Sequence, residues 1–132
     1  NGMFVGKDNS FGKLKTLKGS DGTILGFNIL LAPINFFTGL KDAYNGGLLG
    51  TTLAHETQHA FNRLTGRIEN WKNQSIPQNI IDVFDDFSAN CAGFAYYQYY
   101  TGKPIETGAI YESYKSIKNK FNGIDSKYRK LY

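Results

Sequence analysis

Hydrophobic and polar residues follow two periods along the chain, a strand-like pattern near the N-terminus and helical spacing after it. Segments 12–18 and 23–31 are rich in strand-forming residues and flank the turn 19–22, which reads GSDG, a typical hairpin sequence. The first segment is lysine-rich, as an exposed or edge strand would be, whereas the second is almost entirely apolar. Segment 3–5 offers a short third strand. The pattern therefore predicts a small antiparallel sheet built on a β-hairpin.

A first helix is predicted where Leu53 and Leu64 belong to a series of apolar residues at helical spacing. Asn45 can cap the start of this helix, because its side chain can accept a hydrogen bond from a free backbone N–H of the first turn. Gly66 is a typical stop signal, since glycine adopts the left-handed conformation that often ends a helix. The segment between these two signals is long enough for several helical turns.

Two further helices are predicted downstream. Segment 82–94 reads as a helix with acidic and small residues on one face and aromatic residues on another. Apolar residues spaced by three or four positions between 110 and 121 predict an amphipathic C-terminal helix. Segments 36–47 and 70–78 are predicted loops. The expected fold class is therefore α+β, with an N-terminal hairpin followed by these helices.

The composition is typical of one folded domain spanning residues 1–132, since 41% of the residues are hydrophobic and 15% aromatic. No apolar run approaches the length of a membrane span, and nothing at Asn1 resembles an initiator methionine or a signal peptide. We therefore expect a mature or excised piece of a longer protein, secreted or delivered as one of its domains. The lone Cys91 is expected to pack as a small side chain, because no spare histidine is present to activate it.

The net charge of +4 is concentrated near the C-terminus. Such a basic run can bind nucleic acid or another acidic surface, but a solvated helix face and tail are the more common cause. We therefore do not expect a nucleic-acid partner. The basic residues concerned are Lys115, Lys118, Lys120, Lys127, Arg129 and Lys130.

The chain has two histidines, which stand four residues apart in the run HETQH at 55–59. Residues i and i+4 of an α-helix project from the same face, so His55 and His59 can reach one metal ion. Glu56 can face a water molecule activated by that ion, as the general base does in zinc hydrolases. A surface helix can carry this pattern by chance, but the combination is rare in a chain with so few histidines. The pattern predicts a zinc site with Glu56 as its catalytic base.

A catalytic zinc ion usually has a third protein ligand and one open position. No histidine remains for this role, and a single cysteine excludes a zinc ribbon, so we expect a carboxylate. The next helical segment supplies Asp82, Asp85 and Asp86, and Glu69 is a further candidate. An exposed acidic first turn would also explain the cluster, because the helix dipole favours carboxylates there. The residues by themselves leave the choice open.

The motif and the helix after it, within about residues 48–100, resemble the zincin metallopeptidases of the gluzincin type, in which HExxH precedes a helix reading Glu-x-x-Ala-Asp. Residues 86–90 read DFSAN, so Asp86 stands at the position of the glutamate ligand and Asn90 at that of the aspartate. The resemblance implies Asp86 as third ligand, with Asp82 as a second alignment. It also implies an extended peptide bound along a sheet edge. Because compact zincin domains occur among bacterial secreted proteins and toxins, an inhibitor or immunity protein is an implied partner.

We therefore predict a zinc-dependent peptide hydrolase in which His55, His59 and Asp86 hold Zn²⁺ and Glu56 is the general base. Two alternatives stay open, a zincin-like binding module without catalysis and a basic toxin domain that binds nucleic acid or a partner. The tyrosine-rich segment 96–100 could stabilise an oxyanion, although packing is the more common role of such residues, and none is predicted to be catalytic.

Overall fold

The computed structural model describes residues 11–36 and 47–132. Strands β1 (Gly12–Lys18) and β2 (Ile24–Leu31) pair in antiparallel orientation and form a two-stranded sheet. Gly22 lies in the connecting turn with a φ of 84°, a left-handed conformation that costs a glycine little. The predicted hairpin is therefore confirmed.

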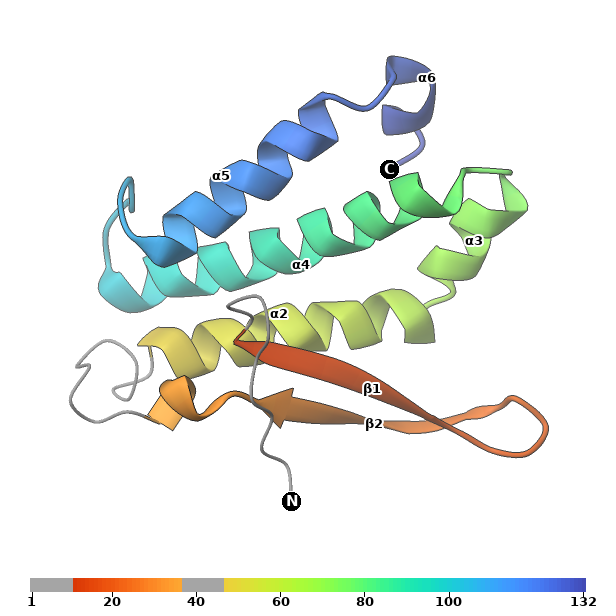
Figure 1. The fold of residues 1–132 in the computed structure, drawn as a ribbon, viewed down its shortest axis with the longest axis horizontal. Helices are drawn as coiled ribbons and strands as arrows, with labels where there is room; N and C mark the ends of the chain where they lie inside the picture. Colours follow the sequence, from red (N-terminus) through yellow and green to blue (C-terminus); the bar gives the residue numbers. More distant parts are fainter. Residues whose placement is uncertain (1–10, 37–46) are drawn as a thin grey trace.

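Helical elements form the rest of the described fold, so the chain is α+β as predicted (Figure 1). None of the helices in the described ranges is long and apolar enough to cross a bilayer. The elements in chain order are η1 (Pro33–Phe36), α2 (Gly47–Leu64), α3 (Arg67–Asn73), α4 (Gln78–Thr101), α5 (Ala109–Asn122) and α6 (Ser126–Arg129).

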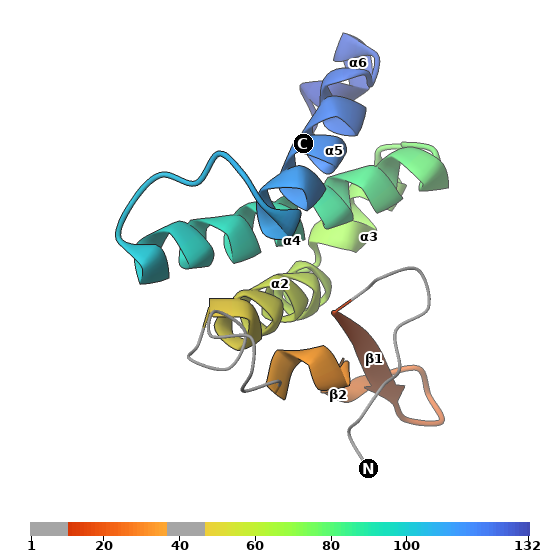
Figure 2. The ribbon, with the colours of Figure 1, turned by 60° about the vertical axis from the view of Figure 1, so that its left-hand side comes forward.

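The elements are stacked on one another, with α2 in the middle (Figures 1 and 2). The hairpin lies against one side of α2, α4 runs back across another side, and α5 packs on α4. The close approach of α2 and α4 depends on small residues of α4. Ala89 is fully buried, and a Cβ added at Gly93 would lie 3.1 Å from the backbone oxygen of Thr51. These small residues therefore place the motif helix directly against the helix that carries the aspartates.

The apolar core lies at the end of α4 that meets α3 and the C-terminal part of the chain. The rings of Trp71 and Phe84 meet edge to face with centroids 5.2 Å apart, and both side chains are almost completely buried. Burial of such side chains is the main source of stability in a domain of this size. The buried members are Trp71, Ile76, Ile81 and Phe84, and Ile68, Ile80, Phe121, Ile124, Tyr128 and Leu131 pack against them.

The predicted loop 70–78 is wrong in its first half, because Asn70–Asn73 belong to α3. This helix has only seven residues, which is too short to show a clear period in the sequence. Burial of Trp71 against α4 stabilises it, so tertiary packing outweighs the weak local signal. The predicted third strand 3–5, the Asn45 cap and most of the predicted loop 36–47 lie outside the described residues.

Beyond the buried Leu48, helix α2 differs from an ordinary amphipathic helix because it exposes large apolar side chains. Leu53, Phe61 and Leu64 are 38%, 55% and 66% exposed. The residues that α2 buries are mostly polar. A buried polar face is costly unless every group finds a partner, so its presence points to a role other than stability. The buried polar residues of α2 are Thr51, Thr52, Glu56, His59 and Asn62.

Candidate metal centre

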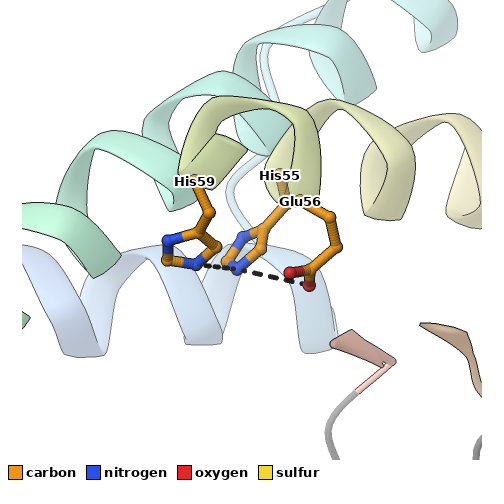
Figure 3. A group of neighbouring side chains, drawn as sticks. All are labelled: His55, Glu56 and His59. Atoms are coloured by element: carbon orange, nitrogen blue, oxygen red, sulfur yellow. Dashed lines mark hydrogen bonds and ion pairs between the residues drawn. The ribbon is translucent and has the colours of Figure 1, made fainter. Parts of the chain in front are cut away.

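The two histidines of α2 point to the same side of the helix, together with Glu56 (Figure 3). The Nε2 atoms of His55 and His59 lie 3.2 Å apart. Two nitrogens bound at about 2.0–2.1 Å to one tetrahedral ion lie about 3.3 Å apart, so the pair already has the spacing of two ligands. Oε2 of Glu56 lies 3.8 Å from Nε2 of His55. The ligand atoms of these three residues form a group positioned to hold a metal ion.

His55 has the protonation state that a metal ligand requires. Burial, and then the nearby His59, lower the pKa of His55 to about 4. The imidazole is therefore neutral at pH 7, and its nitrogen lone pair is available to a cation.

Glu56 lies in a confined position between α2 and the start of β1. Its side chain is only 6% exposed, and burial raises the pKa of the carboxyl group. Gly12 lies directly opposite, because a Cβ added there would be 3.3 Å from Oε2 of Glu56 and 2.7 Å from Cγ2 of Thr52. A residue without a side chain at position 12 therefore lets the hairpin approach the motif.

Asp85 lies against the other nitrogen of His59. Its Oδ2 is 2.9 Å from the buried Nδ1 of His59, and its Oδ1 accepts a hydrogen bond of 2.8 Å from Nδ2 of Asn62. Burial opposes the charge on His59, but the contact with Asp85 outweighs it and raises the pKa of the imidazole. Burial also opposes the charge on Asp85, but His59 and Asn62 outweigh it and lower the pKa of the carboxyl group. A carboxylate in this position orients an imidazole so that Nε2 faces the metal.

Two neighbouring polar side chains complete the support of Asp85. Arg63 donates a hydrogen bond of 2.8 Å to the backbone oxygen of His59 and places Nη2 3.3 Å from Oδ2 of Asp85. The fully buried Asn62 also donates to Oγ of Ser88 and accepts from Nε2 of Gln58. Every polar group of Asn62 thus has a partner, as a buried amide requires. The network fixes α4 relative to α2 at the level of the motif.

The other carboxylates considered as third ligands occupy different places. Asp86 is the nearest to the free side of the histidines, with Oδ1 3.7 Å from Nε2 of His59 and a side chain that is 56% exposed. Asp82 accepts a hydrogen bond from Gln78 one turn earlier. Glu69 lies on α3, where the amino group of Lys72 is 3.8 Å from its carboxylate.

Asn90, which stands at the position of the second aspartate in the gluzincin pattern, donates a hydrogen bond to the backbone oxygen of Asp86. Asp85, and not Asn90, is therefore the residue that contacts Nδ1 of His59.

The two histidines face a cavity of about 490 Å³ that lies between α2, α4 and the edge of β1. His55, Glu56 and His59 line it from α2, and Asp82, Asp85 and Asp86 line it from α4. The ligand atoms of His59, Asp85 and Asp86 lie within 4.8 Å of one another, so His59 belongs to both candidate groups. A metal ion held here would remain accessible to a substrate.

Asn35 is a site residue that the sequence analysis did not identify. It is completely buried, and its Nδ2 donates to the backbone oxygens of Phe11 and Ala32 at 2.7 and 2.8 Å. Its Oδ1 accepts a hydrogen bond of 2.8 Å from Oγ1 of Thr52, one turn before Glu56. This side chain therefore ties the start of the hairpin to the motif helix. Only its position after Pro33 hinted at a structural role, because asparagine commonly caps or ends short turns.

The tyrosines of segment 96–100 lie outside the metal cavity. The ring of Tyr96 covers Gly50 of α2, and Tyr99 is 84% exposed. Among the described residues, no tyrosine lines the cavity. Cys91 is half-buried, and burial raises the pKa of its thiol, which makes it a poorer nucleophile.

Comparisons of the chain with protein-family models, with curated proteins and with solved structures found no match. The function must therefore be inferred from the residues of the site itself.

Proposed function

We propose that this protein is a zinc-dependent peptidase, a member of the zincin type that its sequence resembles. The observation that carries the proposal is the arrangement of His55, Glu56 and His59. Two imidazole nitrogens converge at 3.2 Å, and a buried carboxylate lies beside them at the wall of an open cavity. A fold that needed only stability would not bury such a group on a helix that exposes Leu53, Phe61 and Leu64.

Zinc is the ion that suits this set of donors. Two imidazoles and one carboxylate with a further open position form one of the usual donor sets of a catalytic zinc ion. Asp86 is the proposed third ligand, because its side chain is more than half exposed and can rotate toward the histidines. Asp85 cannot serve equally well, since it already holds Nδ1 of His59. Glu56 then remains available as a base.

A zinc ion held by these residues would lower the pKa of a bound water and polarise the carbonyl group of a peptide. The protein residues supply the remaining functions. Glu56 accepts the proton of the attacking water on its carboxylate and passes it to the leaving nitrogen. Asp85 keeps His59 in the tautomer with its proton on Nδ1. The confined position of Glu56 beside Gly12 limits its freedom to move away from the reacting atoms.

The edge of β1 offers a place for the backbone of a peptide. Residues 12–14 line the same cavity as the histidines, and β1 has β2 as its one strand partner within the described ranges. The free backbone groups of an edge strand can pair with an added extended segment. A peptide bound in this way would pass directly over the motif.

The first test is Glu56→Gln, which keeps the size of the side chain and removes its ability to accept a proton. We expect the variant to bind one zinc ion per chain with unchanged thermal stability, while peptide hydrolysis falls at least about 100-fold. Cleavage of an unstructured protein by the zinc-loaded chain measures the activity. Undiminished hydrolysis by the variant would refute the mechanism. A folded, zinc-loaded wild type without hydrolytic activity would favour the zincin-like binding module.

The second test assigns the ligands by elemental analysis of metal in purified variants. Zinc should be retained in the wild type and lost in His59→Ala and Asp86→Ala. Asp82→Ala is the matched control, because it removes an exposed carboxylate that lines the same cavity. Loss of zinc in Asp82→Ala but not in Asp86→Ala would move the third ligand one turn back along α4. No metal in the wild type after incubation with zinc would exclude the proposed centre.

A further inference from the structure

A second cavity, of about 430 Å³, adjoins the first along the motif helix. Gly12, His55 and Glu56 line both cavities, so the two meet at the proposed reacting groups. The first cavity is lined mainly by charged side chains. The second extends toward the start of α2 and is bounded by Thr51, Gly93 and the beginning of α5. A substrate peptide whose cleaved bond lies near the Glu56 carboxylate would therefore pass the mouth of this cavity.

The walls of the second cavity are largely apolar. Phe11 borders it from the hairpin side, Phe94 from α4, and Ile110 from α5. The ring of Phe94 stacks on Tyr114 with centroids 4.4 Å apart, which holds the α4 wall in place. Apart from Glu56, no charged side chain lines the cavity among the described residues, since His55 is neutral. Such a space favours an apolar group, because a charged one would lose its hydration without a partner.

A polar pair joins the two helices that border the cavity. Oγ of Ser113 donates a hydrogen bond of 3.2 Å to Oδ1 of Asn90, and this bond is exposed to solvent. Nδ2 of Asn90 in turn donates a hydrogen bond of 2.8 Å to the backbone oxygen of Asp86. Ala109 lies one turn before Ser113 on α5, and both residues are exposed. These two residues thus form a rim that can be changed without disturbing the apolar core.

We propose that the 430 Å³ cavity is the specificity pocket of the enzyme and receives an aliphatic or aromatic side chain of the substrate next to the cleaved bond. The assignment rests on the proposed peptidase function. Its basis is the position of His55 and Glu56 in the wall, since a side chain that reaches this cavity belongs to a residue flanking the reacting carbonyl. The substrate class is therefore a peptide with an apolar residue at that position.

The test compares cleavage of peptides that differ at one residue beside the cleaved bond. The zinc-loaded wild type should cleave peptides with Phe or Leu at least about 10-fold faster, in kcat/KM, than those with Gly or Asp. Ala109→Phe narrows the cavity and should bring the ratio of kcat/KM for Phe peptides over Gly peptides close to one. Ser113→Asp places a carboxylate at the rim and should shift the preference toward Lys. Ser116→Asp, on the exposed surface of α5 and outside the cavity lining, is the matched control.

A binding measurement separates this proposal from the peptidase function. The methyl resonance of Ile110 is followed by NMR while N-acetyl-phenylalanine amide or N-acetyl-glycine amide is added. The phenylalanine amide should shift this resonance in the wild type and not in Ala109→Phe, whether or not the protein hydrolyses peptides. Hydrolysis without any preference for apolar residues would overturn the pocket and leave the peptidase standing. If no peptide is hydrolysed, the peptidase function fails, and an unshifted Ile110 resonance would then overturn the pocket as well.

Discussion

The core around Trp71 and Phe84 and the contact between α2, α4 and the hairpin are both buried, but they are built from different side chains. The first consists of aromatic and aliphatic residues that are almost fully enclosed. The second encloses Asn35, Glu56, His59 and other polar groups, each placed beside α4 or the hairpin. Apolar burial stabilises the fold, whereas the polar contact is stable only because its hydrogen bonds are nearly complete. The difference indicates that one face of α4 stabilises the fold, while another face of the same helix borders the candidate metal site.

The largest effect should come from Phe84→Ala in the apolar core. The side chain is fully buried and contacts Trp71 and Phe121, so its loss leaves a cavity as well as lost apolar contacts. We expect a loss of about 3–5 kcal/mol in the free energy of unfolding, measured by urea denaturation. The fraction of the Phe84→Ala variant that remains folded should still bind metal. Loss of metal binding in the folded fraction would show that the two regions are not separate.

Asn35→Ala should give the next largest effect, because it removes three hydrogen-bonding contacts of a fully buried amide. We expect a loss of about 2–4 kcal/mol in unfolding free energy, since the Thr52 hydroxyl loses its acceptor and the backbone oxygens of Phe11 and Ala32 each keep only their backbone N–H donor. Hydrolysis should also fall, because the hairpin no longer holds Gly12 beside Glu56. Asn28→Ala, at an exposed position of β2, is the control and should change neither quantity. Equal effects of the two variants would contradict the positioning role.

Asp85→Asn should weaken metal binding about 10- to 100-fold while the protein stays folded. The amide can donate to Nδ1 of His59, which would move the ring proton to Nε2 and block the metal-binding lone pair. Competition with a fluorescent zinc chelator measures the affinity. Asp82→Asn is the control on the same helix. Unchanged affinity in Asp85→Asn would mean that His59 does not need this carboxylate for its orientation.

Phe61→Ala should have the smallest effect and directly mirrors Phe84→Ala. Phe61 is 55% exposed on the outer face of α2, and alanine is the better helix former. We therefore expect a change of less than about 1 kcal/mol in unfolding free energy by the same urea measurement. A loss as large as that of Phe84→Ala would mean that the outer face of α2 is covered in the native protein.

Local patterns predicted the elements well where they were long. The hairpin and the helices around residues 55, 86 and 115 are all found, because hairpin-turn glycines and helical spacing act within a few residues. The helix α3 was not predicted, since its stability comes from the packing of Trp71 on Phe84 of the next helix and not from a pattern within its own residues. The period of α2 likewise predicted a helix without revealing that Leu53, Phe61 and Leu64 are exposed.

The candidate chemistry follows from the amino-acid pattern, because two histidines and a glutamate at this spacing come together on a helix, and the spacing of a helix is a local property. Tertiary structure alone decided which face of that helix is buried and that Asp85 contacts Nδ1 of His59, whereas Asp86 lies near Nε2. It also decided that Asn35 joins the hairpin to the motif. The physical reason is that adjacent aspartates on one helix differ in direction by about 100°, so only the placement of the neighbouring helix determines the role of each.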